Sequence, residues 1–205
     1  MSSRKRSLAW LASAAALTTA ALTAPVPASA AEPGTPAEGD HCVVNLSKNN
    51  KTTCFGSFTA AIAAATGGAI TNAPADPAEA VNDAAFNAQL KPSGKGESAA
   101  DAGASSARRQ QVIGIEYQHS NHQGASYTFT GNRNCTGPTT DVDFWFAFPG
   151  GSPWHDIISS FRNYSNCFTA HYEHSNFTGR STPYQDDRDY IGDYLNDRTS
   201  SLRWS

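Results

Sequence analysis

The sequence YQHSNHQG at residues 117–124 returns as YEHSNFTG at residues 172–179, and the two stretches align without a gap. A second pair follows in the same order, because DIISSFR at residues 156–162 is matched by DRTSSLR at residues 197–203. Two signals that recur in the same order indicate an internal duplication rather than chance. The C-terminal half of the chain is therefore predicted to consist of two copies of one structural unit.

Both copies have the residue pattern of a β-structure. Aromatic and β-branched residues cluster between Val112 and Ser205, and Gly, Asn and Asp separate them into short segments. One copy alone would expose an apolar sheet face, so the two copies are expected to pack face to face as a sandwich. The residues expected to share a face of a strand are Ile113, Ile115 and Tyr117; Phe144, Phe146 and Phe148; and Phe168, Ala170 and Tyr172.

The hairpins of the two copies share a specific signature. Tyr172–Gly179 has an aromatic residue, four residues, a second aromatic residue, one residue and then glycine. Tyr117–Gly124 has the same spacing, with His122 at the second aromatic position. This pattern resembles the Greek-key signature of the βγ-crystallin superfamily, whose microbial members include calcium-binding proteins. The resemblance covers about residues 112–205 and implies an all-β fold, a βγ-crystallin-like sandwich of two Greek keys.

The resemblance extends to a calcium signature of two Asn/Asp residues, two variable residues, Ser or Thr, and Ser. NDRTSS at residues 196–201 matches it fully, whereas HDIISS at residues 155–160 departs at its first position. In the family, the acid of one motif reaches across to the hydroxyl and the first variable carbonyl of the other motif. A further carbonyl comes from the residue after the first aromatic. The residues implied are Gln118, Asp156, Ile157 and Ser159 in the first copy, and Glu173, Asn196, Asp197, Arg198 and Ser200 in the second.

Calcium is the cofactor that this set of ligands suits, because Ca²⁺ prefers carboxylate, hydroxyl and carbonyl oxygens. Sites with so few carboxylates should bind modestly, with a Kd on the order of 10⁻⁶ to 10⁻³ M. The alternative is that the Asp-Ser turns are structural only, since Asp and Ser side chains often close turns by bonding to neighbouring amides.

The N-terminus is predicted to be a cleaved signal peptide over residues 1–30. Three basic residues, Arg4–Arg6, precede an apolar stretch, and Ala28-Ser29-Ala30 offers a cleavage site. The protein is therefore expected to be secreted, with no membrane span. Its net charge of −3 would fall to about −6 on removal of the signal, which argues against nucleic-acid binding.

Residues 31–40 form a predicted tether, and residues 41–90 a small segment of a hairpin and helices. The hairpin is expected from residues 42–46 and 52–55, one helix from 58–66 after Ser57, and a second helix after Asp76. This segment could dock on the rest, act as a pro-segment or stay partly mobile. A flexible linker is predicted over residues 91–111, before the crystallin-like domain at 112–205.

Four cysteines fit an oxidising compartment. Three pairings are possible, and proximity in sequence favours Cys42 with Cys54 and Cys135 with Cys167.

No enzyme is expected, because the sequence has no nucleophile elbow and no unpaired thiol. His-x-x-His spacing at residues 119–122 and 171–174 could suggest zinc, but residues three apart on a strand face opposite sides. The expected role is binding or structural, as a monomer with calcium as partner.

A secreted protease is the alternative partner, because one family of crystallin-fold proteins inhibits metalloproteases. The inhibitory loop would then be the insertion at residues 132–140, which Cys135 anchors. The loop residues proposed to meet a protease are Asn132, Arg133, Asn134 and Thr136.

Overall fold

The computed structural model describes residues 40–91, 110–137 and 140–205. The predicted signal peptide, nearly all of the tether and most of the linker lie outside the described residues. The described elements are β1 (His41–Asn45), β2 (Thr52–Phe55), α1 (Phe58–Ala65), α2 (Pro77–Asn82), α3 (Ala84–Leu90), β3 (Gln111–Tyr117), the 3-10 turn η1 (Ser120–His122), β4 (Ser126–Gly131), β5 (Phe144–Ala147), β6 (Ser160–Asn163), β7 (Thr169–Tyr172) and β8 (Ser201–Trp204).

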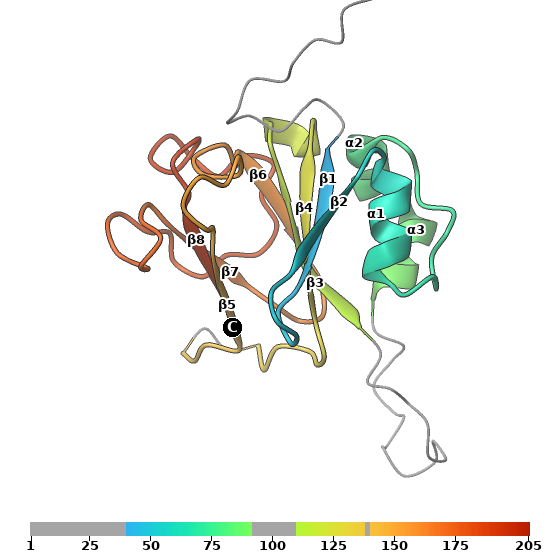
Figure 1. Ribbon diagram of the computed structural model, residues 1–205, viewed down its shortest axis with the longest axis horizontal. Helices are drawn as coiled ribbons and strands as arrows, with labels where there is room; N and C mark the ends of the chain where they lie inside the picture. The colour runs from blue at the N-terminus through green and yellow to red at the C-terminus, as the bar shows by residue number, and fades with distance from the viewer. Residues whose placement is uncertain (1–39, 92–109, 138–139) are drawn as a thin grey trace, which may run out of the picture. The chain divides into compact units, whose positions relative to one another are not determined.

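The strands form two sheets that face each other (Figure 1). One sheet has the order β2-β1-β4-β3-β6 and the other the order β5-β8-β7. Strands of the first copy lie in both sheets, since β5 pairs with β8 of the second copy. In the other direction, a β-bridge between Phe161 and Arg188 joins the second copy to β6 of the first copy. The prediction of a mainly β fold is confirmed.

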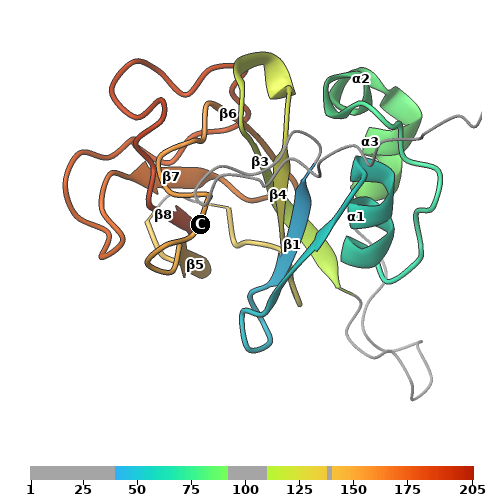
Figure 2. The same ribbon diagram turned by 45° about the horizontal axis from the view of Figure 1, so that its top comes forward.

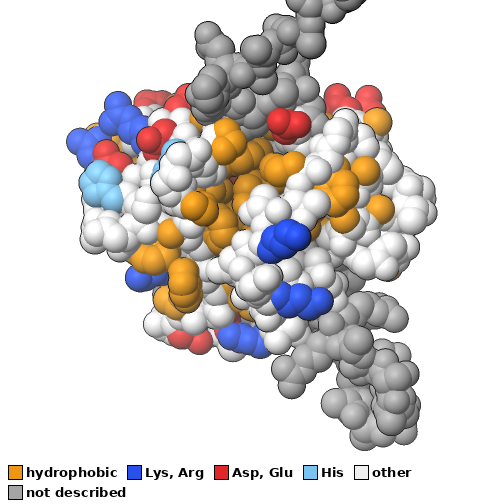
Figure 3. Space-filling view, in the orientation of Figure 1, with side chains coloured by type: hydrophobic (Ala, Val, Ile, Leu, Met, Phe, Trp, Pro, Cys, Tyr) orange, Lys and Arg blue, Asp and Glu red, His pale blue; other side chains and the backbone are white. Residues whose placement is uncertain are grey.

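The space between the sheets is filled by aromatic side chains. Phe144, Phe146 and Phe148 are buried there, as their alternation predicts, and Tyr127 contacts the rings of Phe146 and Phe148. Buried aromatic rings remove large apolar areas from water and contribute most of the stability of such a core. Figure 3 shows hydrophobic side chains gathered over the middle of the face seen in Figure 1, with charged side chains around them.

One predicted face is wrong. Ile113 lies in the core between the sheets, whereas Ile115 and Tyr117 belong to a second apolar cluster with the helices. The reason is a β-bulge between Val112 and Gly114, which shifts the register of β3 against β4. An extra residue in one strand turns every later side chain to the opposite face.

The N-terminal segment docks on this sandwich, which is one of the three alternatives left open by the sequence. Strand β1 pairs in parallel with β4 and so extends the larger sheet, and α1 to α3 lie on one side of that sheet (Figures 1 and 2). Ser57 and Asp76 cap α1 and α2 as predicted, and Asp83 begins the separate helix α3. The cluster beneath the helices comprises Val43, Phe58, Ala61, Ile62, Ala65, Ile70, Ala73, Ala80, Val81, Phe86, Leu90, Val112, Ile115, Tyr117 and Tyr164.

Both disulfides have the pairing that sequence proximity favours. Cys42 and Cys54 are directly opposite in the hairpin of β1 and β2. Cys135 is joined to Cys167 across 32 residues, which ties the insertion of the first copy to the start of the second. Within the described residues, no helix is long and apolar enough to cross a membrane.

Candidate metal centre

The two Asp-Ser turns lie face to face. Asp156 and Asp197 both adopt a left-handed backbone, with φ of 58° and 54°. Asp tolerates this conformation better than most residues, which explains its place in the turn. The amide of Asp156 donates to the carbonyl of Thr199, and that of Asp197 donates to Ile158, each at 3.1 Å. The turns are thus related by an approximate two-fold arrangement.

Each acid reaches the serine of the opposite turn. The Oδ1 atom of Asp156 is 3.0 Å from the Oγ of Ser200, and the Oδ1 of Asp197 is 3.2 Å from the Oγ of Ser159. Both serines are 6% exposed, while both aspartates are exposed. At each of two equivalent surface positions, the carboxylate of one turn therefore lies beside the hydroxyl of the other turn. We call each of these a crossed pair.

The remaining ligands at each position would be main-chain oxygens. The amide of Ser159 donates to the carbonyl of Tyr117, and that of Ser200 donates to the carbonyl of Tyr172, at 3.0 and 2.9 Å. These bonds hold each serine beside the residue that follows the first aromatic of its own copy. In the described part of the chain, no hydrogen bond is accepted by the carbonyls of Gln118, Ile157, Glu173 and Arg198.

The oxygens present suit a hard cation. A calcium ion lies about 2.3–2.6 Å from each ligand oxygen, so neighbouring ligands stand about 3 Å apart. The two crossed pairs have this separation, and carbonyls without a protein donor can turn toward a cation. The residues that would hold an ion are Asp197, Ser159, Ile157 and Gln118 at one position, and Asp156, Ser200, Arg198 and Glu173 at the other.

The first residue of the signature behaves differently in the two turns. Asn196 donates to the Oδ2 of Asp197 at 2.8 Å. His155 instead places Nδ1 3.1 Å from the Oγ of Ser200, and its Nε2 lies 2.9 Å from the carbonyl of Pro149. His155 thus competes for the hydroxyl that Asp156 contacts. The position with Ser200 is therefore expected to be the weaker of the two.

The hairpins that precede these positions show why the signature needs its glycine. Gly124 and Gly179 have φ of +79° and +78°, and a Cβ at either would lie within 2.8 Å of His119 or His174. The residues two before them, His122 and Phe177, are also left-handed, with φ of 62° and 61°. His122 packs edge-on against Tyr117 with ring centroids 5.0 Å apart. The imidazole therefore occupies the place of the second aromatic ring of the signature.

Replacing His122 with phenylalanine should make stability less sensitive to acid. Burial lowers the pKa of His122 below 6.5. The unfolded chain therefore takes up the proton first, and His122 costs stability as the pH falls below 6.5 and through the folded pKa. At neutral pH we expect a change within about 1 kcal/mol, because the ring volume is nearly conserved. Urea unfolding across a pH series measures the difference, and parallel profiles for both proteins would contradict it.

The histidines do not form a zinc site. His122 lies against the carbonyl of Phe161, and His171 pairs with Glu116 inside the sandwich. No group of three or more His, Cys, Asp or Glu side chains within 40–91, 110–137 and 140–205 could hold a metal. The candidate positions above use one carboxylate each and rely on hydroxyl and carbonyl oxygens.

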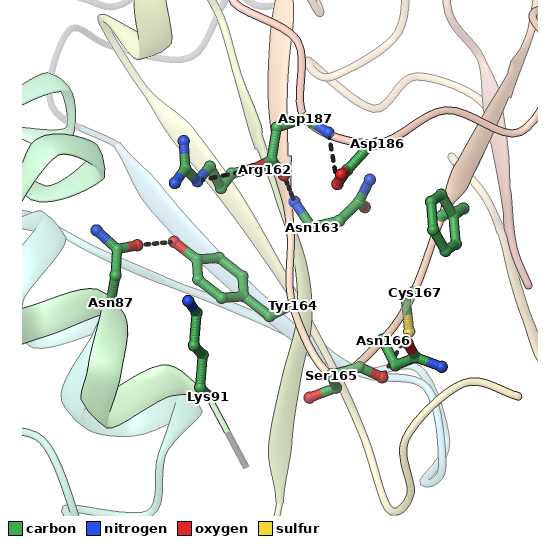
Figure 4. Close-up of a pocket in the computed structure, with 11 residues that line it drawn as sticks. Asn87, Lys91, Arg162, Asn163, Tyr164, Ser165, Asn166, Cys167, Asp186 and Asp187 are labelled. Atoms are coloured by element: carbon green, nitrogen blue, oxygen red, sulfur yellow. Dashed lines mark hydrogen bonds and ion pairs between the residues drawn. The ribbon is translucent and has the colours of Figure 1, made fainter. Parts of the chain in front are cut away.

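A cavity of about 330 Å³ lies elsewhere, between α3 and the turn after β6 (Figure 4). Its polar side chains satisfy one another: Tyr164 donates to Asn87 at 3.1 Å, and Arg162 pairs with Asp187 at 3.1 Å. The first of these contacts binds the helical segment to the sandwich. The residues that line the cavity include none of the candidate calcium ligands.

The loop predicted to meet a protease is held by contacts within the chain. Asp143 pairs with Arg133 and accepts a 2.7 Å hydrogen bond from the amide of Thr136. Burial acts to raise the pKa of Asp143, but these bonds outweigh it and lower the pKa. Asn132 and Asn134 are not hydrogen-bonded through their side chains in the described structure, and residues 138 and 139 lie outside it. Protease inhibition stays a prediction.

The fold is a mainly β sandwich of two sheets, in which the two Asp-Ser turns face each other. Over about 45% of the chain, the structure is similar to bacterial βγ-crystallin domains, which confirms the predicted resemblance. The domain from Flavobacterium johnsoniae is 24% identical, with 45% of this chain and 93% of that chain covered and a TM-score of 0.34. The domain from Clostridium beijerinckii is 21% identical over 45% and 95%, with a TM-score of 0.34. The N-terminal domain of Protein S is 14% identical over 46% and 96%, with a TM-score of 0.36. No protein-family model and no curated protein matches the sequence.

Proposed function

We propose that this chain is a secreted calcium-binding protein with a non-enzymatic binding or structural role. The observation that supports the proposal is the crossed arrangement of Asp156 with Ser200 and of Asp197 with Ser159. Two oxygen pairs of calcium-like separation lie at equivalent positions, and the carbonyls proposed as further ligands accept no hydrogen bond from the residues that the structure describes.

Calcium would act here by joining the two copies. Each position draws its carboxylate from one copy and its hydroxyl from the other, so an ion would bind only when the sandwich is assembled. A ligand that binds only the folded state stabilises it by mass action, by about 2.7 kcal/mol at 100 times its Kd. The ion would also offset the repulsion between Asp156 and Asp197, which face the same interface.

The domain organisation proposed from the sequence accompanies this function. Residues 112–205 would be the crystallin-like domain, and residues 41–90 would be a docked accessory segment after a cleaved signal peptide at 1–30 and a tether at 31–40. Residues 91–111 would connect the two. The strand pairing of β1 with β4 supports a lasting contact between them, because five residue pairs are in register.

The test is thermal unfolding of the mature chain in millimolar calcium and in chelator. We expect calcium to raise Tm by about 5–10 °C, because 1 kcal/mol corresponds to about 2–4 °C at this chain length. Asp197→Ala should remove most of the shift and Asp156→Ala a smaller part, because His155 weakens the second position.

Asp193→Ala is the matched control, because Asp193 is an exposed acid whose carboxylate accepts a hydrogen bond from Tyr190 and is not one of the proposed ligands. It should leave the calcium shift unchanged. An unaltered Tm at millimolar calcium would mean that the Asp-Ser turns serve only to close the fold.

A further inference from the structure

The outer face of the smaller sheet exposes an aromatic residue where the alternation of β5 points away from the core. Trp145 is 56% exposed, whereas its neighbours Phe144 and Phe146 are 7% and 3% exposed. The larger sheet differs, because α1 to α3 cover one of its faces with the apolar cluster described above. A contiguous exposed apolar patch is what marks an interaction surface, and Trp145 has another aromatic ring, that of Phe177, beside it.

Trp145 belongs to a cluster that we call the aromatic platform, formed by Trp145, Phe177, Tyr172 and Arg203. Phe177 contacts Trp145 and Tyr172 edge-on, with ring centroids 5.8 and 5.9 Å apart. Arg203 is directly opposite Trp145 across β5 and β8. Its guanidinium lies 4.6 Å from the ring centroid of Phe177 and 5.3 Å from that of Tyr172. The rings therefore hold the cation in a fixed place.

The duplication supplies a comparison for Arg203. Its counterpart in the first copy is Arg162, which pairs with the carboxylate of Asp187 at 3.1 Å. Arg203 has no carboxylate within ion-pair distance in the described ranges, although it is stacked in a similar strand position. The N–H donors of a guanidinium lie in its own plane and match a carboxylate in a bidentate manner. The described residues thus supply a carboxylate for Arg162 and none for Arg203.

We propose that the aromatic platform binds a carboxylated polysaccharide, such as a polymer of uronic acids. The apolar face of a sugar ring would stack on Trp145, and the carboxylate of that ring or the next would pair with Arg203. The ligand would bring the negative charge that Arg203 lacks, and its sugar rings would supply apolar faces for the aromatic side chains. The side chains of the platform are not among those proposed to bind calcium.

The experiment measures binding of the full mature chain to an oligogalacturonate, by calorimetry in chelator. Chelator is needed because uronates themselves bind calcium, and it makes the result independent of the proposed calcium function. We expect binding that Trp145→Ala and Arg203→Gln each weaken about tenfold or more, which corresponds to about 1.4 kcal/mol. Trp145 is exposed, so its replacement should leave Tm unchanged.

Two controls make the result specific. Tyr194→Ser removes another exposed aromatic, at 68% exposure, that lies outside the platform, and binding should change less than about twofold. The methyl-esterified oligosaccharide keeps the sugar rings but loses the charge, so it should not bind measurably. Equal binding by wild type and Trp145→Ala would overturn the proposal. So would absence of binding, equally tight binding of poly-glutamate, or a dimer of the chain that Trp145→Ala dissociates.

Discussion

Replacing Cys135 and Cys167 together with alanine is expected to lower the free energy of unfolding by about 4 kcal/mol. The bond closes a loop across 32 residues, and its loss gives that freedom back to the unfolded chain. Both cysteines are at most 4% exposed, and the small alanine side chain adds no polar group to their place. Urea unfolding measures the change, and the m-value should rise because the unfolded state becomes more extended.

The matched variant replaces Cys42 and Cys54 with alanine. This bond closes a loop across only 12 residues, so the expected loss is about 3 kcal/mol. Equal or reversed losses would show that the loop between the two copies is already constrained in the unfolded chain.

Most of the sandwich could be predicted from the sequence because it is duplicated. A repeated hairpin signature and a repeated Ser-Ser turn fix the boundaries of each copy, and alternation places Phe144, Phe146 and Phe148 in the core. The bulge at Val112 and Gly114 could not be predicted, because a bulge depends on the pairing partner and leaves no periodic signal in its own strand.

The sequence alone left the docking of the N-terminal segment as one of three alternatives. The hairpin, the two helix starts and the disulfide are local features, and their capping and spacing were sufficient to find them. The parallel pairing of β1 with β4 joins segments about 85 residues apart, as shown by His41 opposite Ser126. No local pattern encodes such a partner.

The candidate metal centre could be predicted as a residue set but not in its details. The signature names Asp197 and Ser159 as partners, whereas the hydrogen bond of His155 to Ser200 follows from the fold of the loop. The aromatic platform was missed because Trp145 looks like one more aromatic in a hydrophobic strand. Strand parity alone carries the signal, since Trp145 alternates with two buried phenylalanines.

A buried acid and base join the two sheets, and breaking this pair should have the second large effect on the free energy of unfolding. Glu116 follows the bulge on β3, so it points into the sandwich, where its Oε2 lies 3.1 Å from the Nε2 of His171 on β7. Both side chains are at most 1% exposed. Among the described residues, neither Oε1 of Glu116 nor Nδ1 of His171 has a hydrogen-bond partner. Burial raises the pKa of Glu116, and the nearby His171 opposes that rise.

Replacing His171 with phenylalanine should therefore destabilise the fold by about 3–5 kcal/mol at neutral pH. The ring would still pack on Phe161, whose centroid is 4.5 Å from that of His171. The loss comes from Glu116, which would be left in the core without its partner. Chemical unfolding at neutral pH measures it.

The pH dependence identifies Glu116 as the cause. Because its folded pKa is raised above 4.5, protonated Glu116 favours the folded state, and this contribution is lost as the pH rises through the folded pKa. Loss of His171 should raise that pKa further, so the deficit of His171→Phe relative to wild type should shrink as the pH falls toward about 4.

The double variant Glu116→Met/His171→Phe is the decisive control. It removes both polar groups and keeps their volume, so it should recover most of the stability at neutral pH and lose the pH-dependent difference. If the double variant is as unstable as His171→Phe at every pH, the imidazole contributes through shape alone, and Glu116 is not the residue that needs it. The unpartnered Oε1 and Nδ1 atoms favour the first outcome, because a pair that is only half satisfied gains little over apolar packing.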